Sequence, residues 1–335
     1  MKLNKKVIFS SVVLSLSLPA WAVNLGEFEG TQVSIGGYIK AEGIFKRPDS
    51  GSNTFDGTAR QSRFNISAKK EVEGHQLTAF VESDFYGGNA TGTSYDLRLR
   101  HAYLKIDNVT VGQTWNGQFF ALAPYDGETI NFFGPGIGTI AGNGATVRRD
   151  LVINYRTPNL LLSAQDPVYT DADYPDVVAG YSHVFSTGSG VGIAATAREV
   201  EVGTDEGKLG AGISFAGRWM LGKNNIKANV FIGEGMGAYS GIYTSDAENG
   251  DLVSQTGFSI AYQQFFTDKL RGTLRYGQVN VDDTADTTMK MPSVNVIYTM
   301  LPGLEFGVEW RDQNIANHPA RPAGQQVELM AKYKF

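Results

Sequence analysis

The chain contains no cysteine in its 335 residues, so no disulfide bond stabilises its fold. An exported protein without disulfides needs another source of stability, and a closed sheet in which every strand is paired provides one. After Ala22 there is also no run of about 18 apolar residues, which excludes membrane-spanning helices. The 40 glycines and the aromatic content of 11% suit strands whose residues alternate between lipid and water.

The sequence also lacks the motifs of common enzymes. Its four histidines are scattered, and there is no nucleophile elbow, HExxH motif or phosphate-binding loop followed by Lys-Ser/Thr. Acidic clusters occur in predicted loops, but they lack the glycine and the terminal glutamate of a calcium loop. We therefore predict no enzyme activity, no cofactor, no metal site and no nucleic-acid partner. The alternative left open is a barrel-face hydrolase whose catalytic residues are distant in sequence.

The first 22 residues have the pattern of a cleaved secretory leader. Three lysines precede an apolar stretch from Val7 to Leu18, and Ala20-Trp21-Ala22 forms a small-x-small cleavage site. A membrane anchor is the alternative, but four serines interrupt the short apolar stretch. We predict a signal peptide over residues 1–22 and a single barrel domain over residues 23–335, with residues 23–32 as a short polar lead-in.

The rest of the chain alternates between apolar and polar residues in short segments separated by turn residues. This pattern predicts an all-β fold, a transmembrane antiparallel β-barrel of about sixteen strands, because bacterial single-chain barrels have an even strand number. Seven short turns alternate with eight longer loops, as in a barrel with tight periplasmic turns and extended outer loops. A soluble sandwich is the alternative. We expect the strands at Val33–Lys46, Arg60–Lys70, His75–Tyr86, Tyr95–Ile106, Val109–Trp115, Asp150–Thr157, Leu160–Gln165, Asp176–Ser186, Val191–Val200, Leu209–Leu221, Ile226–Gly235, Val253–Thr267, Leu270–Val281, Lys290–Leu301, Leu304–Gln313 and Gln325–Phe335.

The last strand carries the clearest local signal. From Val327 to Phe335, every second residue is apolar or aromatic, and the residues between them are mostly charged. A terminal phenylalanine on such a strand resembles the sorting signal of outer-membrane β-barrel proteins. Together with the leader, Phe335 predicts export to the outer membrane of a Gram-negative bacterium, with the barrel-assembly machinery and outer-membrane lipid and lipopolysaccharide as partners.

A long segment without strand alternation, from Asn116 to Arg149, separates two predicted strands. A loop of about 30 residues inside a compact domain is usually functional. On the predicted strand Tyr95–Ile106, Arg98 and Arg100 share one face, and Leu97, Leu99 and Tyr103 are expected on the other. We therefore expect this loop to fold into the barrel beside the arginines and to narrow the water-filled interior.

Several segments resemble the DcaP-like family of trimeric outer-membrane porins. They are Arg60-Gln-Ser-Arg-Phe64, Glu82-Ser-Asp-Phe85, Leu97-Arg-Leu-Arg-His-Ala-Tyr103, Gly112-Gln-Thr-Trp115 and Asn131-Phe-Phe-Gly134. The resemblance implies a sixteen-stranded homotrimeric channel with an inward-folded third loop that takes up small anionic solutes such as dicarboxylates. The chain lacks a long helical segment between leader and first strand, so wall contacts would have to hold a trimer.

We predict an anion-selective porin with a constriction lined by arginines, because their planar, permanently charged groups pair bidentately with carboxylates. Arg63, Arg98 and Arg100 are expected at its centre, with Asp126 and Glu128 of the loop paired to part of this set. A non-selective general porin and a barrel adhesin or structural protein remain alternatives. The complete set of predicted pore-lining residues is Arg63, Arg98, Arg100, Asp126, Glu128, Arg148, Arg149, Arg271, Arg275 and Arg311.

Overall fold

The computed structural model describes residues 22–91, 94–118, 123–130, 148–167, 172–203, 206–239, 245–315 and 323–335. The predicted leader, apart from Ala22, and the segment Asn131-Phe-Phe-Gly134 lie outside these residues. The strands are β1 (Val23–Phe28), β2 (Thr31–Pro48), β3 (Thr54–Thr58), β4 (Arg63–Val72), β5 (His75–Thr91), β6 (Ser94–Ile106), β7 (Val109–Trp115), β8 (Arg148–Arg156), β9 (Leu160–Gln165), β10 (Asp176–Val184), β11 (Gly190–Gly203), β12 (Glu206–Leu221), β13 (Asn224–Glu234), β14 (Ala247–Glu248), β15 (Asp251–Leu252), β16 (Ser254–Phe265), β17 (Leu270–Val281), β18 (Thr288–Leu301), β19 (Leu304–Ile315) and β20 (Gly324–Lys334). Two 3-10 helices, η1 (Ala123–Tyr125) and η2 (Gly237–Tyr239), complete the described elements.

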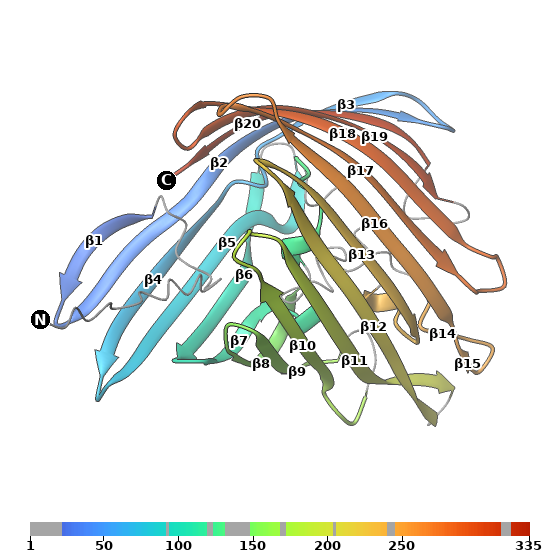
Figure 1. The fold of residues 1–335 in the computed structure, drawn as a ribbon, viewed down its shortest axis with the longest axis horizontal. Coiled ribbons are helices and arrows are strands. Elements are labelled where there is room, and N and C mark those ends of the chain that lie inside the picture. The colour runs from blue at the N-terminus through green and yellow to red at the C-terminus, as the bar shows by residue number, and fades with distance from the viewer. Residues whose placement is uncertain are drawn as a thin grey trace, which may run out of the picture.

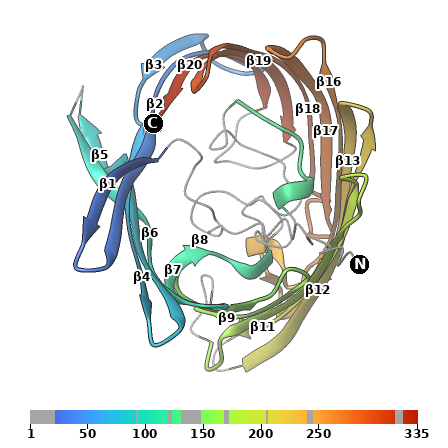
Figure 2. The ribbon, with the colours of Figure 1, turned by 60° about the vertical axis from the view of Figure 1, so that its left-hand side comes forward.

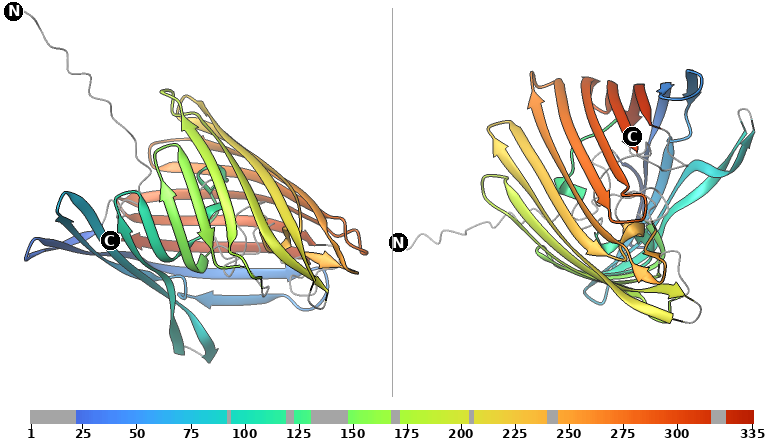
Figure 3. Two further views of the ribbon diagram at one scale, coloured as in Figure 1. Left: turned by 90° about the horizontal axis from the view of Figure 1, so that it is seen from below. Right: turned by 90° about the vertical axis from the view of Figure 1, so that its right-hand side faces the viewer.

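Sixteen of these strands form one closed antiparallel barrel, as predicted (Figures 1 and 2). They are β2, β4 to β13 and β16 to β20, and each pairs with the next along the chain. The first and last strands close the ring, because β2 pairs with β20 from Tyr38–Lys334 to Pro48–Gly324. Closure leaves none of these sixteen strands at an open edge, which supplies the stability that a chain without disulfides needs. Figure 3 shows the tilted strands from two further sides.

Two short strands extend the sheet at both ends of β2. β1 lies in the predicted polar lead-in and pairs with Thr31–Ile35, so this segment holds a strand that was not among those predicted. The physical reason is the turn at Glu29 and Gly30, whose φ angles of 49° and 75° allow a tight hairpin. β3 pairs with Glu42–Lys46 and lies within a predicted outer loop. β2 is therefore longer than the predicted first strand at both ends.

The two faces of the wall differ in chemistry. Large apolar side chains are exposed all around the outside, for example Leu104, Phe215 and Leu329. The alternate positions point inward and are polar and buried, for example Asn65 and Ser214. A wall that is apolar outside and polar inside suits a lipid environment around a water-compatible interior.

One strand departs from strict alternation. In the pairing of β5 with β6, Glu82 lies opposite His101 and Ser83 opposite Leu99, so Arg100 is the extra residue of a β-bulge. The bulge reverses the inside–outside order of the residues that follow it. Tyr103 is only 9% exposed, whereas Leu104 is 63% exposed. The expectation that Tyr103 shares the outward face of Leu99 is therefore wrong.

Among the described residues, no helix is long and apolar enough to cross a membrane.

Candidate functional site

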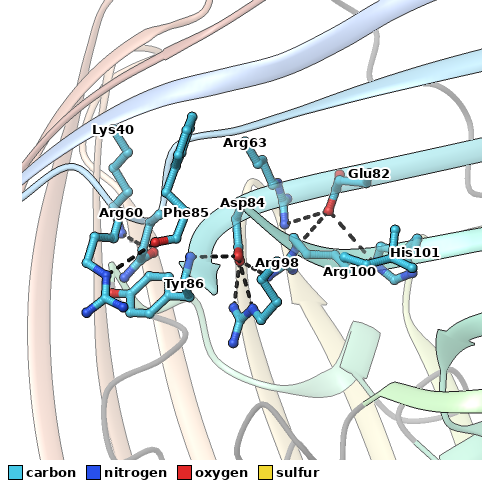
Figure 4. Close-up of polar contacts among 12 residues, drawn as sticks. Lys40, Arg60, Arg63, Glu82, Asp84, Phe85, Tyr86, Arg98, Arg100 and His101 are labelled. Atoms are coloured by element: carbon cyan, nitrogen blue, oxygen red, sulfur yellow. Dashed lines mark hydrogen bonds and ion pairs between the residues drawn. The ribbon is translucent and has the colours of Figure 1, made fainter. Parts of the chain in front are cut away.

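The inner wall of β4, β5 and β6 carries a cluster of three arginines around two carboxylates, which we call the β4–β6 cluster (Arg63, Glu82, Asp84, Arg98 and Arg100; Figure 4). Arg98 binds Asp84 through two hydrogen bonds, with Nε–Oδ1 at 3.0 Å and Nη2–Oδ2 at 2.6 Å. Arg100 bridges both acids, with Nε–Glu82 Oε1 at 2.7 Å and Nη1–Asp84 Oδ2 at 2.8 Å. Arg63 approaches Glu82 at 3.3 Å. The structure therefore brings together the three arginines predicted to form one group.

The register of the three strands explains this arrangement. Arg63 lies opposite Asp84 on β5, and Asp84 lies opposite Arg98 on β6. Because side chains alternate between the faces of a strand, these three residues all point inward. The bulge then places Arg100 beside Glu82, on the same inner face.

Burial divides the arginines of the β4–β6 cluster into two kinds. The side chain of Arg100 is 1% exposed and lies behind the two acids, whereas those of Arg63 and Arg98 are each 29% exposed. Arg100 therefore holds the acids in place, and Arg63 and Arg98 are the more exposed guanidinium groups of the cluster. Three arginines against two carboxylates leave one positive charge in surplus.

Sequence reasoning missed the aromatic part of this wall. The guanidinium group of Arg60 lies 4.5 Å from the centre of the Tyr86 ring, and that of Arg98 lies 5.1 Å from the same ring. Arg63 lies 4.6 Å from the ring of Tyr38. These distances are typical of cation–π contacts, which hold a guanidinium group in place without neutralising its charge. Arg60 was noted only as the first residue of a predicted strand and of one segment that carries the resemblance, and nothing in its spacing marked it as part of the site.

The two loop acids do not pair with the β4–β6 cluster, so that expectation is wrong. Asp126 binds Arg275, with Nη2–Oδ1 at 3.0 Å, and Glu128 binds Arg271 through both carboxylate oxygens at 2.8 and 2.7 Å. Both arginines lie on β17 and belong to the predicted pore-lining set. The acids reach β17 because residues 123–130 run along that part of the inner wall, and the arginines of β4–β6 already have acids of their own.

Residues 123–130 lie inside the barrel. Tyr125 Oη donates a hydrogen bond to the carbonyl of Val191 at 2.8 Å, and burial raises the pKa of its hydroxyl. At the other end, Ile130 N donates to Glu309 Oε2 at 2.8 Å, and Lys40 Nζ donates to the carbonyl of Ile130 at 2.7 Å. The segment therefore contacts the backbone of β11 and inward-facing side chains of β19 and β2, and Figure 2 shows η1 within the ring of strands. This is the described part of the predicted inward-folded loop.

The remaining predicted residues lie at separate places on the wall. Arg149 binds Asp166, the residue after β9, at 2.8 Å. Arg311 is buried between Glu328 and Glu309, with the latter at 3.7 Å. The backbone of Arg148 begins β8, and its side chain lies outside the described residues.

A second positively charged region surrounds Glu305. Its carboxylate accepts Arg271 at 2.8 Å and lies 3.0 Å from Lys332 Nζ and 3.2 Å from Lys334 Nζ. The two lysine side chains are 19% and 34% exposed. Sequence reasoning placed both lysines on the inward face of the last strand but did not include them in the site. Together with Glu128, this region has three cationic side chains and two carboxylates, the same numbers as the β4–β6 cluster.

Within the described ranges, no group of three or more histidine, aspartate or glutamate side chains is placed to hold a metal ion.

The barrel is similar to solved structures that include an outer-membrane channel and another outer-membrane protein. The channel DcaP of Acinetobacter baumannii matches with a TM-score of 0.79 at 20% identity, over 93% of this chain and 100% of DcaP. The outer-membrane protein OmpT of Vibrio cholerae matches at 0.66 and 16% identity, over 93% and 99% of the two chains. OmpF of Salmonella typhi matches at 0.65 and 14% identity, over 91% and 98%. Neither a protein-family model nor a curated protein matches the sequence. The predicted resemblance to DcaP-like porins is thus confirmed at the level of the fold, which is that of a sixteen-stranded porin.

Proposed function

We propose that this chain is an outer-membrane diffusion channel for small hydrophilic solutes that favours anions, including dicarboxylates. The observation that carries this proposal is the β4–β6 cluster, in which two of three arginines remain 29% exposed on the inner wall. A fixed surplus of positive charge in a narrow passage raises the local concentration of anions. The formal net charge of the whole chain, -5, does not oppose this, because predicted loops hold many of the acids.

The preference for dicarboxylates follows from the positions of Arg63 and Arg98. The two exposed guanidinium groups flank Glu82 and Asp84, so two fixed cations are available within one stretch of wall. Arginine pairs bidentately with carboxylates, and a dicarboxylate has one carboxylate for each arginine. The region around Glu305 offers Lys332 and Lys334 as further weak sites, and conduction is faster along several weak sites than through one strong site.

The proposed location rests on the outer face of the wall and on both ends of the sequence. Exposed apolar side chains surround the barrel, and the leader pattern and the terminal strand indicate export and assembly. Phe335 closes the wall through its backbone, because its N–H donates to the carbonyl of Gly37 at 3.2 Å. Outer-membrane lipid, lipopolysaccharide and the barrel-assembly machinery are the corresponding partners, and a non-enzymatic role belongs to the same proposal.

A homotrimer is the proposed assembly. One of the similar solved structures, OmpT of Vibrio cholerae, is described in a trimer form. Mass measurement of the detergent-solubilised protein tests this part of the proposal, and a stable monomer would contradict it.

Single-channel recording in planar bilayers tests the function itself. We expect stable conductance and, under a salt gradient, a reversal potential that shows anion preference. Influx of dicarboxylates into liposomes should exceed that of neutral solutes of equal size. A barrel without conductance would refute the channel, and a cation-selective channel would refute the role of the arginines.

A further inference from the structure

The connection between β13 and β16 was predicted to be an outer loop, but part of it is buried. Met236 and Tyr239 are 0% and 2% exposed, and residues 235–239 form the segment that we call the η2 segment. The Tyr239 hydroxyl donates to Asp176 Oδ2 at 2.5 Å and accepts from Gln165 Nε2 at 2.6 Å. Because Asp176 and Gln165 are inward-facing residues of β10 and β9, the η2 segment lies inside the barrel, as Figure 2 shows.

A buried ionic network fixes the η2 segment to the wall. Arg198 of β11 lies 3.6 Å from Asp176 and 2.8 Å from Asp246, which follows the η2 segment in the chain. Asp246 also accepts a hydrogen bond from the backbone N–H of Ala238 at 3.1 Å. Burial and the neighbouring Asp176 hold the pKa of Tyr239 well above its ordinary value, so its hydroxyl keeps the proton that it donates.

Two glycines make room for the segment. A Cβ atom at Gly212 would lie 3.1 Å from Met236 Cγ, and one at Gly233 would lie 2.9 Å from the same atom. Both glycines point inward, on β12 and β13. Larger residues at these positions would crowd Met236 as well as neighbouring atoms of the wall, so the small residues leave room for the Met236 side chain.

The same network contacts the other inward-folded loop. Gln165 Oε1 accepts a hydrogen bond from Gly117 N at 2.9 Å, and the Nε2 atom of the same side chain donates to Tyr239. Gly117 begins the connection that continues to residues 123–130. One amide side chain therefore holds both inward segments, and both occupy space that the barrel would otherwise leave to water.

We propose that the η2 segment is a second constriction element of the channel, and that Tyr239 and Asp246 are the positioning residues that hold it in the lumen. The inference rests on the proposed channel function. In this proposal, the η2 segment on the β9–β13 side of the wall sets the pore size, and the β4–β6 cluster on another part of the wall sets the charge selectivity. Releasing the η2 segment should widen the passage and leave the anion preference in place.

The test compares Tyr239→Phe with Tyr276→Phe in single-channel recordings. Tyr276 is the matched control, because its hydroxyl bonds to Gln278 on the outward side of β17. Loss of the hydroxyl removes both buried hydrogen bonds of Tyr239. Excursions to a larger conductance should then become about tenfold more frequent, which corresponds to a change of about 1.4 kcal/mol in the free energy of releasing the η2 segment. Equal traces for the two variants would overturn the inference.

A cysteine pair makes the test reversible. The chain has no cysteine, so Gly212→Cys with Met236→Cys introduces the sole thiol pair. In a protein that also carries Tyr239→Phe, the oxidised pair should restore the wild-type conductance. Reduction of the disulfide should free the η2 segment, and the excursions to larger conductance should return. Failure of the pair to form a disulfide would contradict the place of Met236, and identical oxidised and reduced traces would contradict the constriction. A wild-type protein that does not conduct would instead refute the channel itself.

Discussion

If the β4–β6 cluster sets the selectivity as proposed, single substitutions that change one charge should shift it in either direction. Arg98→Gln leaves two guanidinium groups against two carboxylates, and Asp84→Asn leaves three against one. We expect the first variant to lower the anion preference and the second to raise it. The double variant keeps two guanidinium groups and one carboxylate, so it should return towards the wild type. When Arg98 is replaced, Asp84 keeps its hydrogen bonds from Arg100, at 2.8 Å, and from the backbone N–H of Tyr86, at 3.1 Å. The barrel should therefore still assemble.

The size of the effect follows from Coulomb's law. A monoanion about 4 Å from a lost guanidinium group loses about 1 kcal/mol in water and about 4 kcal/mol at an effective dielectric constant near 20. The 29% exposure of Arg98 places it towards the screened limit. An energy of about 1 kcal/mol changes the occupancy of such a site about fivefold. A dianion carries twice the charge, so its occupancy should change by about 25-fold on the same basis.

Reversal potentials across a bilayer under a potassium chloride gradient measure this preference directly. Lys223→Gln is the matched control, because it also removes one positive charge but lies on an exposed turn, paired with Asp268. Repeating the measurement at several salt concentrations should show the effect shrinking as screening increases. The reasoning is refuted if Arg98→Gln and Asp84→Asn shift the potential in the same direction, or if the control shifts it as much as they do.

Three further predictions concern assembly, the inward loop and pH. Deletion of Phe335 removes the backbone pair with Gly37, so we expect less heat-modifiable folded barrel on gels, and wild-type levels would argue against a role in assembly. Glu128→Gln weakens the bidentate ion pair of the inward loop, so conductance should become noisier, and quiet traces would show that the remaining contacts suffice. A hydrogen bond from His75 lowers the pKa of Asp107, so this contact stabilises the turn above the ordinary carboxyl pKa and is lost as the pH falls through the lowered value. His75→Ala should therefore reduce thermal stability at neutral pH but not at strongly acidic pH, and an equal loss at both would contradict the assignment.

The fold was largely predictable because each barrel strand repeats the same simple pattern. Inside–outside alternation located all sixteen strands, and those from Val109 to Trp115 and from Leu270 to Val281 match the structure at both ends. β1 and β3 were missed because they are short, and their pairing depends on a turn at Glu29 and on the length of β2. Alternation also cannot reveal a bulge, so the inward position of Tyr103 became visible only in three dimensions.

The site was predictable to the extent that alternation decides which side chains face inward. It placed Arg63, Arg98 and Arg100 on one face, and the structure brings them together. Which acid each arginine meets depends on strand register and loop path, which leave no local pattern. Glu128 and its arginine partner on β17 are 143 positions apart in the sequence. The burial of Arg100 behind two acids likewise follows from the bulge rather than from its spacing.

Incomplete neutralisation of the arginines would keep anion binding weak enough for release, which a channel requires. An isolated guanidinium group in a passage of low dielectric constant would bind a carboxylate strongly and release it slowly, because the attraction of about 4 kcal/mol at 4 Å exceeds thermal energy several times. Glu82 and Asp84 offset most of the charge of the three arginines around them, and Glu128 and Glu305 do the same for Arg271, Lys332 and Lys334. Each region then has only a small net positive charge with which to attract an anion. Under the proposed function, two weak sites on different parts of the wall would let a solute move from one to the next, which a single unpaired arginine would not.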